Sequence, residues 1–93
     1  MEKIITADGT EFQISYGGPV SITENVVFLV RIINSDVDSV HNTFKNPENT
    51  ETLTIVLIEG DPGSQYTGYT RYCGFDVDND GGITVILKKN LGV

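Results

Sequence analysis

The sequence predicts an α+β fold, mainly antiparallel β, with about six strands in the order β-β-β-α-β-β-β. Val, Ile, Thr, Tyr and Phe are plentiful, and these residues fit the pleated, half-buried surface of a sheet. Ten glycines among 93 residues indicate frequent turns. Apolar residues at helical spacing occur in one convincing stretch, residues 37–44. A chain of this length is expected to form a single domain, 1–93, with one hydrophobic core.

Two strands joined by a hairpin turn are expected at the start of the chain. Residues 2–6 form the first strand, and the Asp8-Gly9 pair is typical of a tight turn between antiparallel strands. Residues 11–16 alternate between apolar and polar side chains and form the second strand. The segment 17–21, "GGPVS", is expected to end that strand, because its proline cannot donate a hydrogen bond to a ladder.

The third strand, residues 25–33, is nearly continuous in apolar residues. This pattern indicates burial on both faces, or a strand that is shared between the core and a subunit contact. Arg31 interrupts the pattern, and its charge has to reach solvent or a carboxylate.

The one helix is expected to begin at Ser35, a natural N-cap, with Asp36 and Asp38 at the positive end of the helix dipole. Its apolar stripe faces a sheet and consists of Val37, Val40, His41 and Phe44. Pro47 limits the helix and can start one further helical turn.

Three strands complete the predicted order, at residues 52–59, 65–77 and 83–89. The Pro62-Gly63 pair after the first of them is typical of a type II turn. The middle strand is long, so a bulge or a bend is expected at Gly68 and at Gly74. Short turns join these three strands, which predicts an antiparallel meander.

One helix cannot cover a six-stranded sheet. We therefore expect a curled sheet, a small barrel or sandwich with the helix packed on it, or a second copy of the chain that covers the remainder. Two rows of the 25–33 strand are candidates for such a contact: Val26, Phe28, Val30 and Ile32, or the opposite row Val27, Leu29 and Ile33. Among the aromatic residues, Tyr66 and Tyr72 are expected to face outward as further protein-contact candidates, whereas the inward positions are Tyr69, Cys73 and Phe75.

The charge balance limits the kinds of partner. Thirteen acidic and six basic residues give a net charge of −7. Such a surface repels nucleic acid phosphates and anionic membranes, so neither is expected as a direct partner. The excess of acids serves solubility, or it fits a partner with a basic face.

Cysteine content and the N-terminal segment bear on location. Cys73 is the only cysteine, which fits a reducing compartment or a virion assembled in one, and a buried, inert thiol is expected. The N-terminal segment has no secretory h-region, and no apolar run approaches the roughly 20 residues of a membrane span. The expected location is a virion or the bacterial cytoplasm, without secretion by a signal peptide.

The segment 76–81 matches the first half of a calcium-binding loop, with oxygen ligands from Asp76, Asp78 and Asp80. The twelfth position of that loop is Leu87, which cannot bind calcium, and the flanking residues are typical of strands. The residues in between accept left-handed turn geometry. A plain hairpin turn is therefore favoured and no metal is expected, with a calcium site at the three aspartates as the weaker alternative.

No group of residues points to catalysis. His41 is the only histidine and has no second metal ligand beside it, so a structural role is expected. The segment 60–64, "GDPGS", lacks the lysine and the following helix of a phosphate-binding loop. The sequence therefore predicts a non-enzyme without catalytic residues and without a cofactor.

Four segments carry a resemblance to a known group of proteins: "IITADGTEFQISY", "NTFKNPENTETLTI", "YTGYT" and "GGITVILKK". Through them the chain resembles short uncharacterised proteins of prophage late and tail gene clusters in Gram-positive bacteria, over most of its length. The resemblance implies a non-enzymatic role in or around a phage tail or baseplate, with oligomerisation, and no catalytic residues to carry over.

The expected function is therefore protein–protein contact as a structural or accessory protein, with a copy of itself or a phage structural protein as the partner. The alternative is an acidic inhibitor that occupies a basic groove of a host nucleic-acid-binding protein. In that case the charge is presented by Asp61, Asp76, Asp78 and Asp80. A calcium-binding module is the third and weaker hypothesis.

Overall fold

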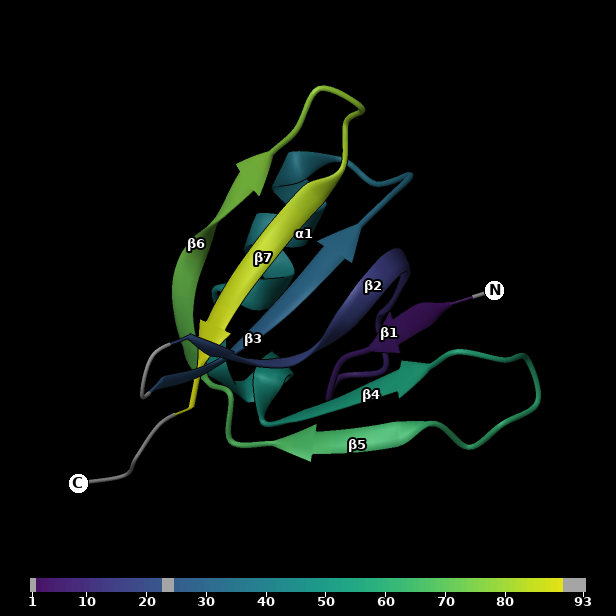
Figure 1. The fold of residues 1–93 in the computed structure, drawn as a ribbon. Helices are drawn as coiled ribbons and strands as arrows, with labels where there is room; N and C mark the ends of the chain where they lie inside the picture. The colour runs from purple at the N-terminus through teal and green to yellow at the C-terminus, as the bar shows by residue number, and fades with distance from the viewer. Residues whose placement is uncertain (1, 23–24, 90–93) are drawn as a thin grey trace.

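The computed structural model describes residues 2–22 and 25–89. Within this part of the chain the expected α+β class with mainly antiparallel strands is confirmed, and there are seven strands where the sequence predicted six. In chain order the elements are β1 (Lys3–Ile5), β2 (Glu11–Ile22), β3 (Asn25–Ile32), α1 (Val37–Phe44), the 3-10 turn η1 (Pro47–Thr50), β4 (Thr52–Val56), β5 (Ser64–Thr67), β6 (Arg71–Val77) and β7 (Ile83–Lys88) (Figure 1).

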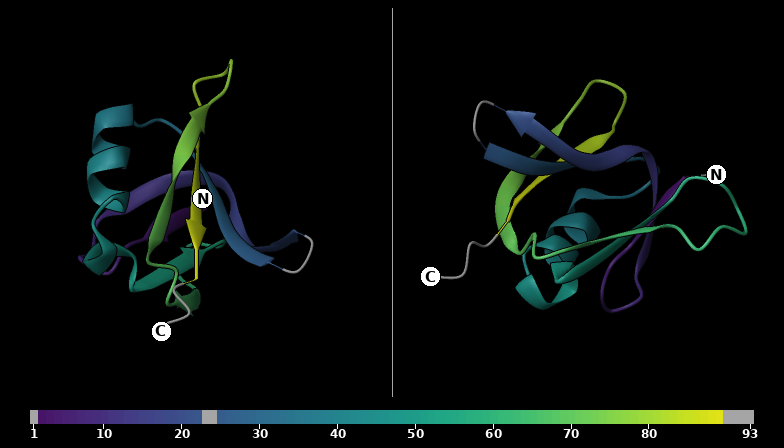
Figure 2. Two further views of the ribbon diagram at one scale, coloured as in Figure 1. Left: turned by 90° about the vertical axis from the view of Figure 1, so that its left-hand side faces the viewer. Right: turned by 60° about the horizontal axis from the view of Figure 1, so that its bottom comes forward.

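All seven strands belong to one curled antiparallel sheet in the order β5-β4-β1-β2-β3-β7-β6. Strand β2 joins the two halves, because its first residues pair with β1 and the rest of it pairs with β3. The register shifts between Ile14 and Tyr16, and such a bulge bends a strand. The sheet therefore wraps around the core without closing, with β5 and β6 as its outermost strands (Figures 1 and 2).

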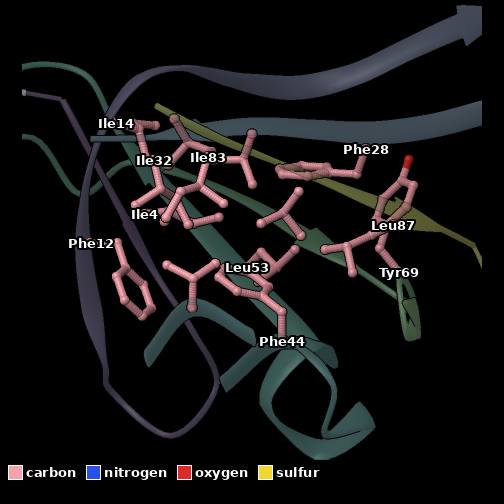
Figure 3. Close-up of a cluster of buried hydrophobic side chains, with 14 residues drawn as sticks. Ile4, Phe12, Ile14, Phe28, Ile32, Phe44, Leu53, Tyr69, Ile83 and Leu87 are labelled. Carbon is pink, nitrogen blue, oxygen red and sulfur yellow. The ribbon is translucent and has the colours of Figure 1, made fainter. Parts of the chain in front are cut away.

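The hydrophobic core fills the inner side of the curl, where α1 packs against it (Figure 3). The helix contributes Val40 and Phe44, both fully buried, and the Phe44 ring lies 5.7 Å from the ring of Phe12. Every second residue of β7 also points into the core, as alternation along a strand requires.

The start of α1 differs by one residue from the prediction. Asp36, not Ser35, is the N-cap, and its Oδ2 accepts a hydrogen bond of 3.0 Å from the Ser39 N–H. Its Oδ1 also accepts from the Ser39 hydroxyl at 2.8 Å. Two hydrogen bonds to one residue, together with the carboxylate charge at the helix N-terminus, favour Asp36 over the neutral Ser35. These hydrogen bonds lower the pKa of Asp36.

The predicted strand 65–77 is two strands, so the expectation of one bent strand is wrong. Residues 68–70 separate β5 from β6, with Gly68 at a φ of +86° and its N–H donating to the Glu51 carbonyl at 3.1 Å. The expected meander is wrong for the same reason. Hairpin β4–β5 lies at one end of the sheet and hairpin β6–β7 at the other.

The segment "GGPVS" does not end β2, which continues to Ile22. Strand β1 pairs only with residues 11–13, so the later half of β2 has β3 as its one neighbour. A proline is tolerated on such a free edge, and Pro19 lies opposite Phe28 there. Gly17 packs closely, since a Cβ at this position would lie 3.0 Å from the side chain of Ile55.

Candidate protein-contact surface

The inward row of β3 belongs to the core of the single chain. Phe28 and Val30 are fully buried, and the Phe28 ring lies 5.3 Å from the ring of Tyr66 and 5.2 Å from that of Tyr69. The expectation that Phe28 and Val30 form a protein-contact face is therefore wrong. The curl of the sheet supplies the apolar partners that a second copy was expected to provide.

Tyr66 and Tyr72 are half-buried and pack against the core, so the expectation that they face outward is wrong. Cys73, expected inside, is exposed. The cause is a register shift between Tyr72 and Phe75, where Gly74 adopts a φ of +106°. This bulge breaks the alternation, so that both flanking aromatic rings face the core.

His41 takes a packing role between these rings. Its Nδ1 lies 3.0 Å from the hydroxyl of Tyr72, and its ring centroid is 5.9 Å from that of Phe75. Burial raises the pKa of Tyr72. The arrangement connects α1 to the edge strand β6 and fits the structural role expected for His41.

The turn between β6 and β7 is organised by Asp78. Its Oδ2 accepts from the Nε of Arg31 at 2.7 Å, and its Oδ1 accepts from Nη2 at 3.1 Å. The same Oδ1 accepts from the N–H groups of Asp80 and Gly82, each at 3.0 Å. The hydrogen bonds from Arg31, with those from the turn, lower the pKa of Asp78 to about 2.

This geometry bears on the calcium alternative. Asp78, the middle one of the three aspartates, accepts hydrogen bonds from the Arg31 guanidinium and from N–H groups of the turn that it begins. This is the hairpin turn that the sequence favoured. Within residues 2–22 and 25–89, no three or more His, Cys, Asp or Glu side chains are grouped so that they can hold a metal ion. The geometry therefore favours the plain hairpin turn over a calcium site.

The outward side chains of β2, β3, β6 and β7 form one continuous surface, here called the outer face. The strand register aligns them in rows across the sheet. One row joins Gly18, Leu29 and Ile86, and the next joins Val20, Val27, Lys88 and Arg71. Leu29 and Ile86 are half-buried, Val27 is buried and Val20 is 42% exposed. The middle of the outer face is therefore apolar, and Val20 is its exposed apolar side chain.

The outer face also holds a basic pair, Arg71 and Lys88, which lie directly opposite each other in the register of β6 and β7. Like charges at opposed positions destabilise a sheet. Within the described part of the chain the ion pairs are Lys3–Glu11 and Arg31–Asp78, so neither member of the basic pair has one. The sequence analysis did not identify Ile86 as a contact residue, although its alternation with the buried residues of β7 assigns it to the outer face.

A second exposed apolar feature lies between β4 and β5, in residues 57–61, here called the β4–β5 loop. Strand β4 ends at Val56, short of the predicted residue 59, and leaves Leu57 58% exposed and Ile58 65% exposed. Glu59 and Asp61 follow at once and are exposed too. The loop therefore presents two large apolar side chains beside two carboxylates.

Comparisons with known proteins add no relative. No protein-family model matches the chain, and the searches of curated proteins and of solved structures found no significant match. Among the described residues no helix has the length and apolar character needed to cross a membrane.

Proposed function

We propose that this protein acts through protein–protein contact, as a non-enzymatic accessory or structural component of a phage tail or baseplate. The observation that carries the proposal is the outer face, an apolar sheet surface that α1 does not cover because the helix packs on the inner side. Exposed apolar surface with a charged rim is typical of a protein contact site. The phage setting rests on the resemblance of the sequence segments.

The experiment uses a matched pair of substitutions in one hairpin. Val20 and Val26 are 42% and 44% exposed, but Val20 lies in an outer-face row and Val26 is paired with Ser21 in a row of the opposite face. We expect the wild-type chain and Val26→Asp to copurify with phage particles induced from a lysogen that encodes them. Val20→Asp is expected to be lost from the particles.

Two results would count against the proposal. One is the absence of the wild-type chain from purified particles. The other is equal incorporation of the two aspartate variants, because that would show that the outer face does not hold the chain in the particle. Circular dichroism spectra of both variants serve as the check that each is folded.

The second candidate is the acidic inhibitor, and one observation favours it. Asp36, Asp80 and Glu11, the last of which is paired with Lys3, lie around an open hollow of about 610 Å³ near the start of α1. The acids expected from the sequence do not act together, since Asp78 is paired with Arg31 and Asp61 lies on the β4–β5 loop.

Titration against a basic nucleic-acid-binding protein at rising salt concentration tests this candidate, because salt screens charge-driven binding. Asp80→Asn is expected to weaken such binding, whereas Asp61→Asn leaves it unchanged. Equal effects of the two substitutions, or binding that is insensitive to salt, would remove the inhibitor hypothesis.

A further inference from the structure

The outer face and the β4–β5 loop match each other in both polarity and charge. The outer face combines an apolar middle with the basic pair Arg71 and Lys88 near Val20, and its acidic residue Asp76 lies toward the other end of β6. The loop combines Leu57 and Ile58 with two carboxylates. We propose that the partner of the outer face is a second copy of this chain, whose β4–β5 loop docks on it head to tail. This inference rests on the proposed function of the outer face as a protein-contact surface.

Charge is the argument for this particular orientation. A net charge of −7 opposes association of two copies unless a basic surface of one meets an acidic surface of the other. Arg71 and Lys88 repel each other across the β6–β7 ladder, and carboxylates from a docked loop would neutralise both. Glu59 and Asp61 are the acids that adjoin exposed apolar side chains in the loop.

The loop is held in a defined shape before any contact is made. The Asp61 N–H donates to the carbonyl of Ile58 at 3.1 Å, which closes a turn around the loop. Gly63 allows the chain to return close to β4, since a Cβ there would lie 2.7 Å from the carbonyl oxygen of Ile55. A segment ordered in advance loses less conformational entropy when it binds.

The β4–β5 loop and the strands β6 and β7 lie on different sides of the molecule, the loop at the right and the two strands at the left of Figure 1. Strands β5 and β4 stand at one end of the strand order, and β7 and β6 stand at the other (Figure 1). In the head-to-tail arrangement that we propose the contact is heterologous, so that in a pair of copies one keeps a free outer face and the other keeps a free loop. Repetition of such a contact gives a ring or an open chain of copies.

The size of the contact sets its strength. A short loop on a small patch buries less than the roughly 1,200 Å² that stable complexes reach, so the association of two free copies is weak. Many copies held in a ring or on a larger assembly strengthen it through effective concentration. The association must therefore be measured at high protein concentration and low salt.

The test uses two variants that each destroy one side of the contact. The loop variant is Leu57→Ser with Ile58→Ser, and the outer-face variant is Val20→Asp, with Val26→Asp as the control. Sedimentation velocity at millimolar protein concentration is expected to show concentration-dependent association for the wild-type chain and the control. Each variant alone is expected to stay monomeric, because one of its two surfaces is lost.

The mixture of the two variants identifies the head-to-tail geometry. The intact loop of the outer-face variant meets the intact outer face of the loop variant, so the mixture forms one-to-one dimers and nothing larger. A loop variant that associates like the wild-type chain would overturn the inference. A wild-type chain that stays monomeric would also overturn it, while the particle experiment with Val20→Asp and Val26→Asp still decides the proposed function separately.

Discussion

Replacement of Phe44 by alanine should remove the main anchor of α1. The side chain is fully buried, and only Val40 and Phe44 of this eight-residue helix are buried. A helix this short has no stability of its own in water, so its packing decides whether it forms. Loss of a buried phenylalanine costs about 3–5 kcal/mol. The whole chain is expected to have an unfolding free energy of only about 5–14 kcal/mol, at ~0.05–0.15 kcal/mol per residue.

Thermal unfolding followed by circular dichroism measures this effect. At roughly 4–8 °C of Tm for each kcal/mol in a domain of this size, Phe44→Ala is expected to lower Tm by at least about 12 °C. Asn42→Ala, at an exposed position of the same helix, is the control and is expected to keep or slightly raise Tm. A Tm for Phe44→Ala within about 4 °C of the wild-type value would refute the reasoning that Phe44 holds the helix on the sheet.

Three further predictions concern the turn of β6–β7 and the bulge. A Cβ at Gly82 would fall on the Arg31 guanidinium, so Gly82→Ala should lower Tm in the wild-type chain and have a much smaller effect in an Arg31→Ala background. The pKa of Asp78 is lowered to about 2, so its contribution to stability is present above pH 4 and is lost as the pH falls through 2. The free energy of unfolding, measured with urea, should therefore fall more steeply between pH 4 and 2 for the wild-type chain than for Asp78→Asn. Equal pH dependence of the two chains would contradict the pairing of Asp78 with Arg31. Cys73 is exposed at the bulge, so a thiol reagent should label it in the native chain about as fast as in urea, whereas labelling only after unfolding would mean that the bulge is absent.

The parts of the fold that depend on local chemistry could be predicted from the sequence. The hairpin turn at Asp8-Gly9, the turn before β7 and the apolar stripe of α1 each follow from residues adjacent in the chain. Arg31 pairs with the carboxylate of Asp78, in line with the expectation that a charge within an apolar strand contacts solvent or a carboxylate. In the turns and the helix, the interactions that determine the structure are between residues close in the sequence. For Arg31, a charge within an apolar strand requires an oppositely charged partner or solvent.

The failures share a different cause. Gly68 was expected as a bulge or bend within one strand, but it follows the end of β5. Gly74 makes the bulge that was expected there, and the unforeseen part is that this bulge exchanges the orientations of Cys73 and Tyr72. In β3 both rows are apolar, so its own sequence does not determine that Phe28 faces the core. The opposition of Arg71 and Lys88 depends on the register of two strands, which the sequence alone does not fix.

Residue-resolved NMR on the uniformly ¹⁵N-labelled chain tests the central claim most directly. As the protein concentration rises at low salt, the amide shifts should move at two places together, in the outer-face residues of β3 and β7 and in residues 57–61. Shifts that move only around the hollow at the start of α1, or no movement up to millimolar concentration, would contradict the claim that the outer face of one copy receives the β4–β5 loop of another.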